Sequence, residues 1–247
     1  MDDWLEGRIT EKRRWTERLY SLRIDAPINR FTPGQFIRVA LDIDGERIAR
    51  PYSCVNPPDE PGLEIYYNTV EGGPLTTALL DLGEGDTLWV GRNASGFFTL
   101  DEVPTAPQLW MLATGTGLGV FLCLLGTAEA WQRFDQLRLV HSVRSVEELT
   151  YRERIDEIRS AHPGRFDYIP MVSRESCDFA LAGRIPAAIE DGRLERRADL
   201  RIDPDLSQVM LCGNQDMIRD ATQVLSERGL RRNRRRTPGH ITTEKYW

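Results

Sequence analysis

The chain has 247 residues, of which 40% are hydrophobic and 28% are charged, and its net charge is −6. This composition suits one large globular domain or two ordinary ones. No apolar run approaches the ~18 residues that a membrane span needs, and the first residues lack the basic and apolar regions of a signal peptide. The four cysteines include no CxxC pair, which disfavours a zinc site or a cysteine-bound iron–sulfur cluster. We therefore expect a reduced, cytoplasmic protein that is not bound to a membrane.

The first hundred residues predict short strands separated by turns. The expected strands cover residues 4–10, 19–24, 36–41, 47–55, 63–70 and 87–91. Turn sequences such as Asp44-Gly45 separate them, and a helical pattern over residues 74–82 interrupts the series. Short strands at this spacing indicate a small antiparallel barrel or sandwich.

The segment Arg50-Pro51-Tyr52-Ser53 carries the clearest chemistry in this half. In a strand, residues two apart face the same side, so Arg50 and Tyr52 share one face. A guanidinium can bind two phosphate oxygens, and a tyrosine ring can lie on a flat heterocycle. A neighbouring hydroxyl can meet a ring nitrogen that gains and loses hydrogen. The segment therefore suggests a flavin dinucleotide.

After a proline-containing linker at residues 101–107, strands and helices alternate. Strands are expected over residues 108–113, 137–142, 166–172 and 207–212, and helices over 120–131, 145–161, 184–191 and 215–228. This alternation predicts a parallel sheet with helices on its faces. We predict two domains, residues 1–101 and 102–247.

A glycine-rich turn, residues 114–119, joins the first strand of the second half to its helix. Glycines there allow backbone N–H groups to approach a phosphate, although a tight turn that binds nothing is the alternative. The turn is not the full GxGxxG fingerprint, because its third glycine comes one residue early. The next strand runs into Val143 and Arg144 rather than an acidic residue, which disfavours the usual NAD arrangement.

Further polar residues follow the third and fourth strands of this half. Ser173, Arg174 and Arg184 suit a phosphate monoester such as the 2′-phosphate of NADP; the alternative is surface arginines paired with Glu175. Cys212 and the glycine after it would let a ligand approach closely. No histidine falls in a nearby motif, so Cys212 is not expected to be a nucleophile.

The end of the chain is basic, with a charge of +6 over residues 228–247 against −12 for the rest. The densest run contains Arg231, Arg232, Arg234, Arg235 and Arg236. A solvated surface, a docking patch for an acidic partner and a phosphate clamp are all open, whereas nucleic-acid binding is disfavoured by the acidic remainder. The last residues, Tyr246-Trp247, suggest rings that dock on a protein groove or on a ligand.

These motifs, in their order along the chain, closely resemble those of bacterial ferredoxin/flavodoxin–NADP(+) reductases of the short type that ends in an aromatic residue. The likeness covers essentially the whole chain. The segments that carry it are residues 50–53, 115–117, 172–174, 211–214 and the stretch from 238–240 to 246–247. The resemblance implies an N-terminal antiparallel FAD-binding β-barrel and a C-terminal parallel-sheet NADP-binding α/β domain, with a C-terminal extension that returns to FAD.

The resemblance also implies site residues. The FAD residues would be Arg50, Pro51, Tyr52, Ser53, Tyr66, Tyr67, Asn68, Pro74, Leu75, Thr76, Thr116 and Trp247. The NADP residues would be Val143, Arg144, Ser173, Arg174, Arg184, Asn214, Gln215, Asp216 and Asp220. As catalytic residues, Ser53 would hydrogen-bond near the reactive flavin nitrogen and Cys212 would shape the nicotinamide pocket. Plant-type members carry a carboxylate near the flavin; Glu244 is the nearest candidate here, and we do not assign it that role.

The expected function is an FAD-dependent oxidoreductase that moves electrons between NADPH and an acidic one-electron carrier, ferredoxin or flavodoxin. The chain has neither the length nor the cysteines for a ferredoxin domain of its own, so the carrier is expected to be separate. Its dock would be the arginine run, with Lys12, Arg13 and Arg14 as candidate contributors. The alternatives are an NADPH-dependent flavin or quinone reductase without a protein partner and a non-catalytic flavin-binding electron-transfer subunit. We expect a monomer.

Overall fold

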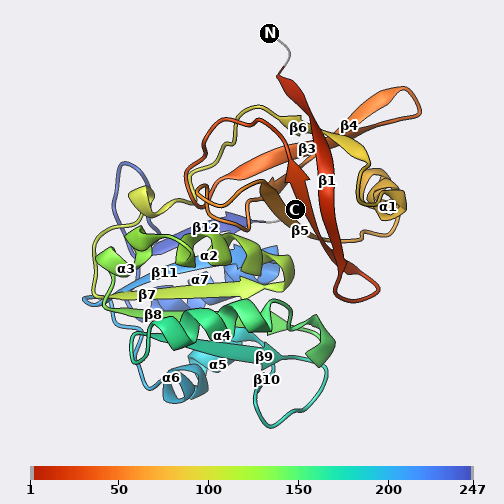
Figure 1. Cartoon of the computed structure of the whole chain (residues 1–247). Helices are drawn as coiled ribbons and strands as arrows, with labels where there is room; N and C mark the ends of the chain where they lie inside the picture. Colours follow the sequence, from red (N-terminus) through yellow and green to blue (C-terminus); the bar gives the residue numbers. More distant parts are fainter. Residues whose placement is uncertain (1–2, 246–247) are drawn as a thin grey trace.

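The computed structural model describes residues 3–245, which form two six-stranded sheets, one above the other in Figure 1. The first sheet is antiparallel, in the order β4-β3-β6-β1-β2-β5. Its strands are β1 (Trp4–Arg14), β2 (Leu19–Asp25), β3 (Phe36–Ile43), β4 (Glu46–Ser53), β5 (Leu63–Asn68) and β6 (Thr87–Gly91). A bridge from Cys54, just after β4, to Ile65 on β5 draws the two edge strands together into a half-closed barrel.

The inside of this barrel is apolar because alternate strand residues face inward. Ile9, Leu22, Val39 and Ile65 are fully buried there, and the helix α1 (Pro74–Asp81) adds Leu79. On β5 the inward residues alternate with Glu64 and Tyr66, which contact the second domain.

The second sheet is parallel, in the order β10-β9-β8-β7-β11-β12. Its strands are β7 (Gln108–Thr114), β8 (Gln136–Val143), β9 (Phe166–Val172), β10 (Leu181–Ala182), β11 (Ser207–Gly213) and β12 (Ile241–Lys245). The edge strand β12 lies nearest the first domain (Figure 1). Short 3-10 turns, η1 (Leu100–Glu102), η2 (Gly115–Gly117) and η3 (Val146–Glu148), join several elements.

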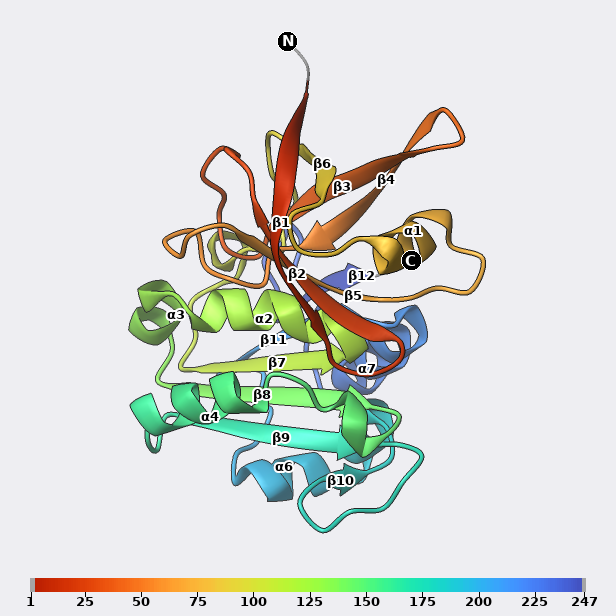
Figure 2. The same cartoon turned by 45° about the vertical axis from the view of Figure 1, so that its right-hand side comes forward.

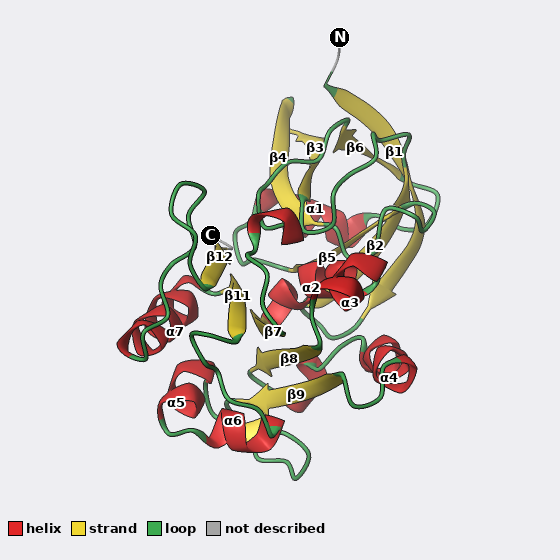
Figure 3. Ribbon diagram, turned by 90° about the vertical axis from the view of Figure 1, so that its left-hand side faces the viewer, coloured by secondary structure: helices red, strands yellow, loops and turns green. Residues whose placement is uncertain are grey.

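Helices cover both faces of the parallel sheet (Figure 3). One face carries α2 (Leu118–Leu125), α3 (Ala128–Arg133) and α4 (Arg152–Ala161); the other carries α5 (Ile185–Glu190), α6 (Arg193–Ala198) and α7 (Gln215–Glu227). Successive β7 residues explain this, since Met111 packs with the first set and Leu112 with the second. None of the helices within residues 3–245 is long and apolar enough to span a bilayer.

The predicted fold class, an antiparallel barrel followed by a parallel-sheet domain, is confirmed. The boundary placed after residue 101 falls inside η1, between the two sheets. The single helix expected over 120–131 is wrong: Gly126 ends α2, and the extended backbone of Thr127 starts α3. The helix expected over 145–161 begins only at residue 152, because Tyr151 has a positive φ of 55°. The strands β10 and β12 and the helix α6 were not predicted.

Lys12, which the sequence suggested as a contributor to the docking surface, lies at the end of helix α1. Its ammonium group donates to the carbonyls of Leu79, Leu80 and Leu82 at 2.5–3.1 Å, at the end of α1. A cation at a helix C-terminus satisfies otherwise unpaired carbonyls and complements the helix dipole. Lys12 is therefore a helix cap and is removed from the candidate docking surface.

Candidate active site

One cavity is lined by both domains. Phe36, Pro51, Tyr52, Ser53, Tyr66 and Tyr67 line it from the first domain, and Thr116, Glu244 and Lys245 from the second. The structure therefore brings together five residues that the sequence had suggested for the FAD site: Tyr52, Ser53, Tyr66, Tyr67 and Thr116. Because β4 and β5 belong to one domain and η2 and β12 to the other, the cavity exists only in the assembled pair.

Buried polar atoms without partners converge on this cavity. Within residues 3–245, the hydroxyls of Tyr52 and Tyr67 and the Oε2 of Glu244 are buried and lack a hydrogen-bond partner. Burial raises the pKa of Tyr52 to about 12 and also raises that of Tyr67, so both rings stay protonated donors at neutral pH. Buried polar groups nearly always have a partner, so three orphans around one space indicate a polar ligand.

Ser53 and Glu244 form a hydrogen bond across the domain boundary. Ser53 is buried at the end of β4, and its hydroxyl donates to the carboxylate of Glu244 on β12. Burial raises the pKa of Glu244 to about 7, and the hydrogen bond from Ser53 only partly offsets that effect. The carboxyl can therefore hold or release a proton near neutral pH, although the sequence had given it no role. The β-branched run Ile241-Thr242-Thr243 could have predicted the edge strand, but the pairing of Glu244 with Cys212 is visible only in the structure.

Two glycine turns at the ends of β7 and β11 pack against each other. A side chain on Gly117 would lie within 2.7 Å of the carbonyl of Cys212, and Gly213, at φ 123°, packs on Thr114. The Thr114 hydroxyl accepts from the backbone N–H of Asn214 at 2.8 Å. Cys212 itself is fully buried beside this contact and does not line the cavity. Its role in a nicotinamide pocket stays a prediction.

His141 forms a hydrogen bond with the backbone of the glycine-rich turn. Its Nε2 lies 3.0 Å from the Gly115 carbonyl, and its Nδ1 lies 3.3 Å from the hydroxyl of Tyr168. Burial lowers the pKa of His141 to about 4, so the ring is neutral at pH 7. A carbonyl can only accept, which assigns the single ring proton to Nε2 and makes the Tyr168 hydroxyl the donor to Nδ1.

The start of α1 has the features of an anion site. Gly73 provides no side-chain cap, Pro74 occupies the first turn, and that turn contains no acidic residue. The Leu75 side chain is buried in the barrel, whereas the Thr76 hydroxyl accepts from the backbone N–H of Val70 at 3.1 Å. The helix packs on β3 and β4. Arg50 is exposed on β4, and its guanidinium donates to the carbonyl of its neighbour Ala49. Asn68 is half-buried at the end of β5.

A group of exposed arginines lies at the carboxyl ends of β8, β9 and β10. Backbone hydrogen bonds join Ser173 to Val143, and Arg174 to Arg144, at 2.9–3.0 Å. Among residues 3–245, the side chains of Arg144, Arg174 and Arg184 have no ion pair with a carboxylate. Glu175, the suggested alternative partner, accepts instead from the Val146 N–H. The arrangement is a basic edge open to an anion.

Most of the other residues that the sequence suggested for NADP are buried or already engaged in hydrogen bonds or ion pairs. Val143 is buried, and its carbonyl accepts from both the N–H and the hydroxyl of Ser173. Asn214 caps α7, with Gln215 exposed in its first turn, and both Asp216 and Asp220 pair with Arg219 at 2.7–2.9 Å. Contact between these residues and NADP stays a prediction. Trp247, predicted near the FAD adenine, lies outside the described residues.

Comparisons with known proteins agree with this site. The family model of the oxidoreductase FAD-binding domain matches residues 8–95, and that of the oxidoreductase NAD-binding domain matches residues 111–223. Flavodoxin/ferredoxin–NADP reductases of Shigella flexneri and Escherichia coli are each 46% identical over the full length of both chains. The structure of a ferredoxin NADP+ reductase from Neisseria gonorrhoeae, with bound FAD and NADP, superposes with a TM-score of 0.94 over 99% of each chain at 31% identity.

The chain belongs to the flavodoxin/ferredoxin–NADP reductase family, as the sequence resemblance predicted. It is an oxidoreductase with an FAD-binding and an NADP-binding domain. FAD fits the cavity, because a flat heterocycle with polar edges would supply partners for the three orphaned groups. The anion site at α1 and Arg50 would hold its diphosphate. When bound, FAD accepts a hydride and passes electrons on one at a time.

Proposed function

We propose that this protein transfers electrons between NADPH and a flavodoxin or ferredoxin, with FAD held in the cavity between its domains. The observation that carries the proposal is the set of polar groups, from both domains, that surround this cavity and have no partner in the described part of the chain. The domains are taken as residues 1–101 for FAD and 102–247 for NADP. Since none of the cysteines within residues 3–245 forms a disulfide, we place the protein in the reducing cytoplasm, where it would act as a monomer.

Each domain would hold one reactant. Tyr52 and Tyr67 would donate to FAD, and Tyr66 and Thr116 would complete the wall of its site. Arg144, Ser173, Arg174 and Arg184 would bind the 2′-phosphate of NADPH and so bring the nicotinamide end to the strand ends. Ser53 and Glu244 would hold a proton next to the reacting atoms, because their hydrogen bond and the raised pKa of Glu244 allow exchange near neutral pH.

The first experiment compares reduction of the FAD-loaded protein by NADPH and by NADH without oxygen, followed by loss of flavin absorbance. Fast bleaching by NADPH alone supports both the cofactor assignment and the phosphate clamp. Equal rates with both nucleotides would reject the clamp and favour a general flavin reductase. Absence of bleaching with either would favour the non-catalytic subunit.

The electron carrier would dock beside the arginine loop, residues 231–236. Arg235 lies over the exposed ring of Phe97 at 4.2 Å and pairs with Glu102 at 3.0 Å. Gly96 in turn packs against Phe36, which lines the cavity. Two residues, Gly96 and Phe97, therefore separate the loop from the cavity wall, which leaves the loop within reach of an acidic protein that needs access to the flavin.

Charge reversal tests the dock. The double variant Arg234→Glu/Arg235→Glu should slow reduction of an acidic flavodoxin at low salt by about tenfold or more and flatten its salt dependence, because steering acts on the association rate. Reduction of ferricyanide, which needs no dock, should be unchanged. The double variant Arg159→Glu/Arg197→Glu, on α4 and α6, is the control matched for net charge. An unaltered salt profile in Arg234→Glu/Arg235→Glu would reject this docking surface.

A further inference from the structure

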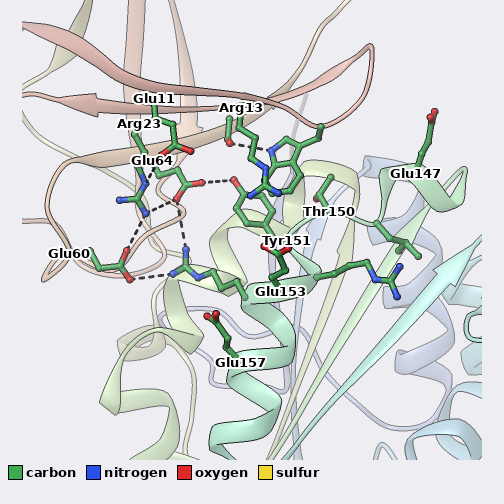
Figure 4. A pocket seen from close by; sticks show the side chains of 15 residues that line it. Glu11, Arg13, Arg23, Glu60, Glu64, Glu147, Thr150, Tyr151, Glu153 and Glu157 are labelled. Carbon is green, nitrogen blue, oxygen red and sulfur yellow. Dashed lines mark hydrogen bonds and ion pairs between the residues drawn. The ribbon is translucent and has the colours of Figure 1, made fainter. Parts of the chain in front are cut away.

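A cleft of about 610 Å³ lies between the domains and outside the flavin cavity. The β1–β2 hairpin forms one wall, and the start of α4 forms the other, beside the carboxyl ends of β7 and β8 (Figures 1 and 2). Figure 4 shows Glu11, Arg23, Glu60 and Glu64 pointing toward one another, whereas Glu147 and Glu157 point elsewhere. The part of the cleft around Glu64 is therefore a contact between the domains.

Glu64 is the centre of this contact. It stands on β5 in the FAD domain, with its side chain only 8% exposed. Its Oε1 accepts from the hydroxyl of Tyr151 at 2.7 Å, and its Oε2 lies 3.4 Å from Arg23 and 3.9 Å from Arg154. Tyr151 and Arg154 belong to the NADP domain, so a buried carboxylate of one domain depends on the other domain for two of its partners.

Tyr151 adopts an unfavourable backbone conformation to reach Glu64. Its φ of 55° is uncommon for any residue with a side chain, and it is buried at the N-cap of α4 without capping that helix. Burial, together with the charge of Glu64, raises the pKa of its hydroxyl, which therefore remains a donor. Packing with the ring of Trp15 at 4.5 Å fixes the side chain from the hairpin. Such strain persists only where its surroundings hold it in place.

The contact is continuous with the flavin cavity. Glu64 and Tyr66 are two apart on β5 and share a face, and Tyr66 lines the cavity. The hydroxyl of Tyr66 bonds to that of Thr150 at 2.9 Å, and its ring meets Tyr151 edge-on at 5.2 Å. The segment 150–151 therefore contacts both Glu64 and Tyr66, and through Tyr66 a wall of the flavin site.

We propose that Glu64, Tyr151 and Arg154 are positioning residues for hydride transfer, which set the NADP domain against the FAD domain so that the nicotinamide meets the flavin at reacting distance. This rests on the proposed function, because the two reactants are held on different domains. If the two domains shift relative to each other by about 1 Å near the site, the rate of hydride transfer falls, although every group that touches a reactant is still present.

The test is Tyr151→Phe, which removes one hydroxyl and keeps the ring. In stopped flow with saturating NADPH, we expect the limiting rate of flavin reduction to fall about tenfold, since small misplacements are costly. Affinity for NADP+, measured by titration of the flavin spectrum, should stay within about twofold, and the flavin–nicotinamide charge-transfer absorbance should weaken. Glu64→Gln should lower the limiting rate of flavin reduction by a similar factor. The double variant Glu64→Gln/Tyr151→Phe should be little slower than either single variant, because the two residues belong to one network.

Tyr20→Phe is the matched control, because its hydroxyl donates within the FAD domain, to the carbonyl of Glu17 at 3.2 Å. Should Tyr151→Phe fold poorly, Arg154→Gln alters the same contact from a half-buried position. Limiting rates within twofold of wild type in the folded variants, or a loss confined to NADP+ affinity, would overturn the inference. If NADPH failed to reduce the wild-type flavin, the proposed function itself would fail, and the two failures are thus distinguishable.

Discussion

The flavin cavity and the Glu64 contact both bury polar side chains between the two domains, but they differ in how those side chains are satisfied. In the cavity, Tyr52, Tyr67 and Glu244 each have a buried atom without a partner among residues 3–245. At the contact, the carboxylate of Glu64 has three neighbours, and the hydroxyl of Tyr151 is bonded to it. Burying an unpaired polar group is costly, so the first region makes sense only with a ligand and the second is complete by itself.

The same contrast separates charged groups at the surface. Arg174 and Arg184 stand at strand ends with no carboxylate partner in the described chain, while Arg219 on α7 pairs with both Asp216 and Asp220. Unpaired groups at strand ends thus indicate where a reactant binds, and paired groups indicate where the fold stabilises itself. The following predictions test this distinction.

The largest effect is expected at the unpaired arginines. Arg174→Ala/Arg184→Ala should lower kcat/KM for NADPH by about 100-fold or more, because each charge-assisted hydrogen bond contributes about 1.5–3 kcal/mol. The value for NADH should change by less than about threefold, since NADH lacks the 2′-phosphate. Arg159→Ala, which removes a paired arginine from α4, is the control. Equal losses with both nucleotides would mean that these arginines do not read the phosphate.

A smaller but still large effect is expected at Ser53. Ser53→Ala removes the donor to Glu244 and should lower the rate of hydride transfer by about tenfold or more, with little change in NADP+ affinity. Ser226→Ala, whose hydroxyl bonds within α7, is the matched control. Equal hydride-transfer rates in wild type and Ser53→Ala would remove Ser53 from the catalytic residues.

The sequence predicted those parts of the site that depend on local pattern. Arg50 to Ser53 lie on a strand whose alternation is visible. Arg144 and Arg174 follow two predicted strands that must end at one edge of a parallel sheet, whereas the strand before Arg184, β10, was not predicted. Cofactor class and fold followed from these segments together.

The sequence did not reveal residues whose function depends on pairing between distant segments. Glu244 reaches Ser53 only because β12 joins β11 at the sheet edge nearest the first domain. Tyr151 and Glu64 are 87 positions apart, and the positive φ that aims Tyr151 leaves no compositional signal in a run without glycine. Such contacts follow from the packing of the two domains, which neither periodicity nor motif encodes.

In the FAD-free protein, the buried carboxyl of Glu244 should make the free energy of unfolding depend moderately on pH. Its folded pKa is raised to about 7 from 4.5, so between these values the folded state keeps a proton that the unfolded state has lost. The free energy of unfolding should therefore fall as pH rises from 4.5 to 7, by at most about 3 kcal/mol. Denaturation of the FAD-free protein at pH 5 and pH 8 should show this loss in wild type and not in Glu244→Gln. An identical pH dependence in both would mean that Glu244 is not buried as a charged group.

The smallest effect is expected at Lys12, a group that the fold satisfies completely outside the site. Lys12→Met should cost about 0.5–1 kcal/mol of unfolding free energy, the usual contribution of a cation at a helix C-terminus, measured by urea denaturation against Arg14→Met. Reduction of the FAD-loaded protein by NADPH should not change. Lys12 caps the end of α1 that points away from the expected phosphate, so it stabilises the helix without contacting a reactant. A slower reduction in Lys12→Met would instead show that the orientation of α1 is transmitted to the flavin, and that a fully paired group can also tune the site.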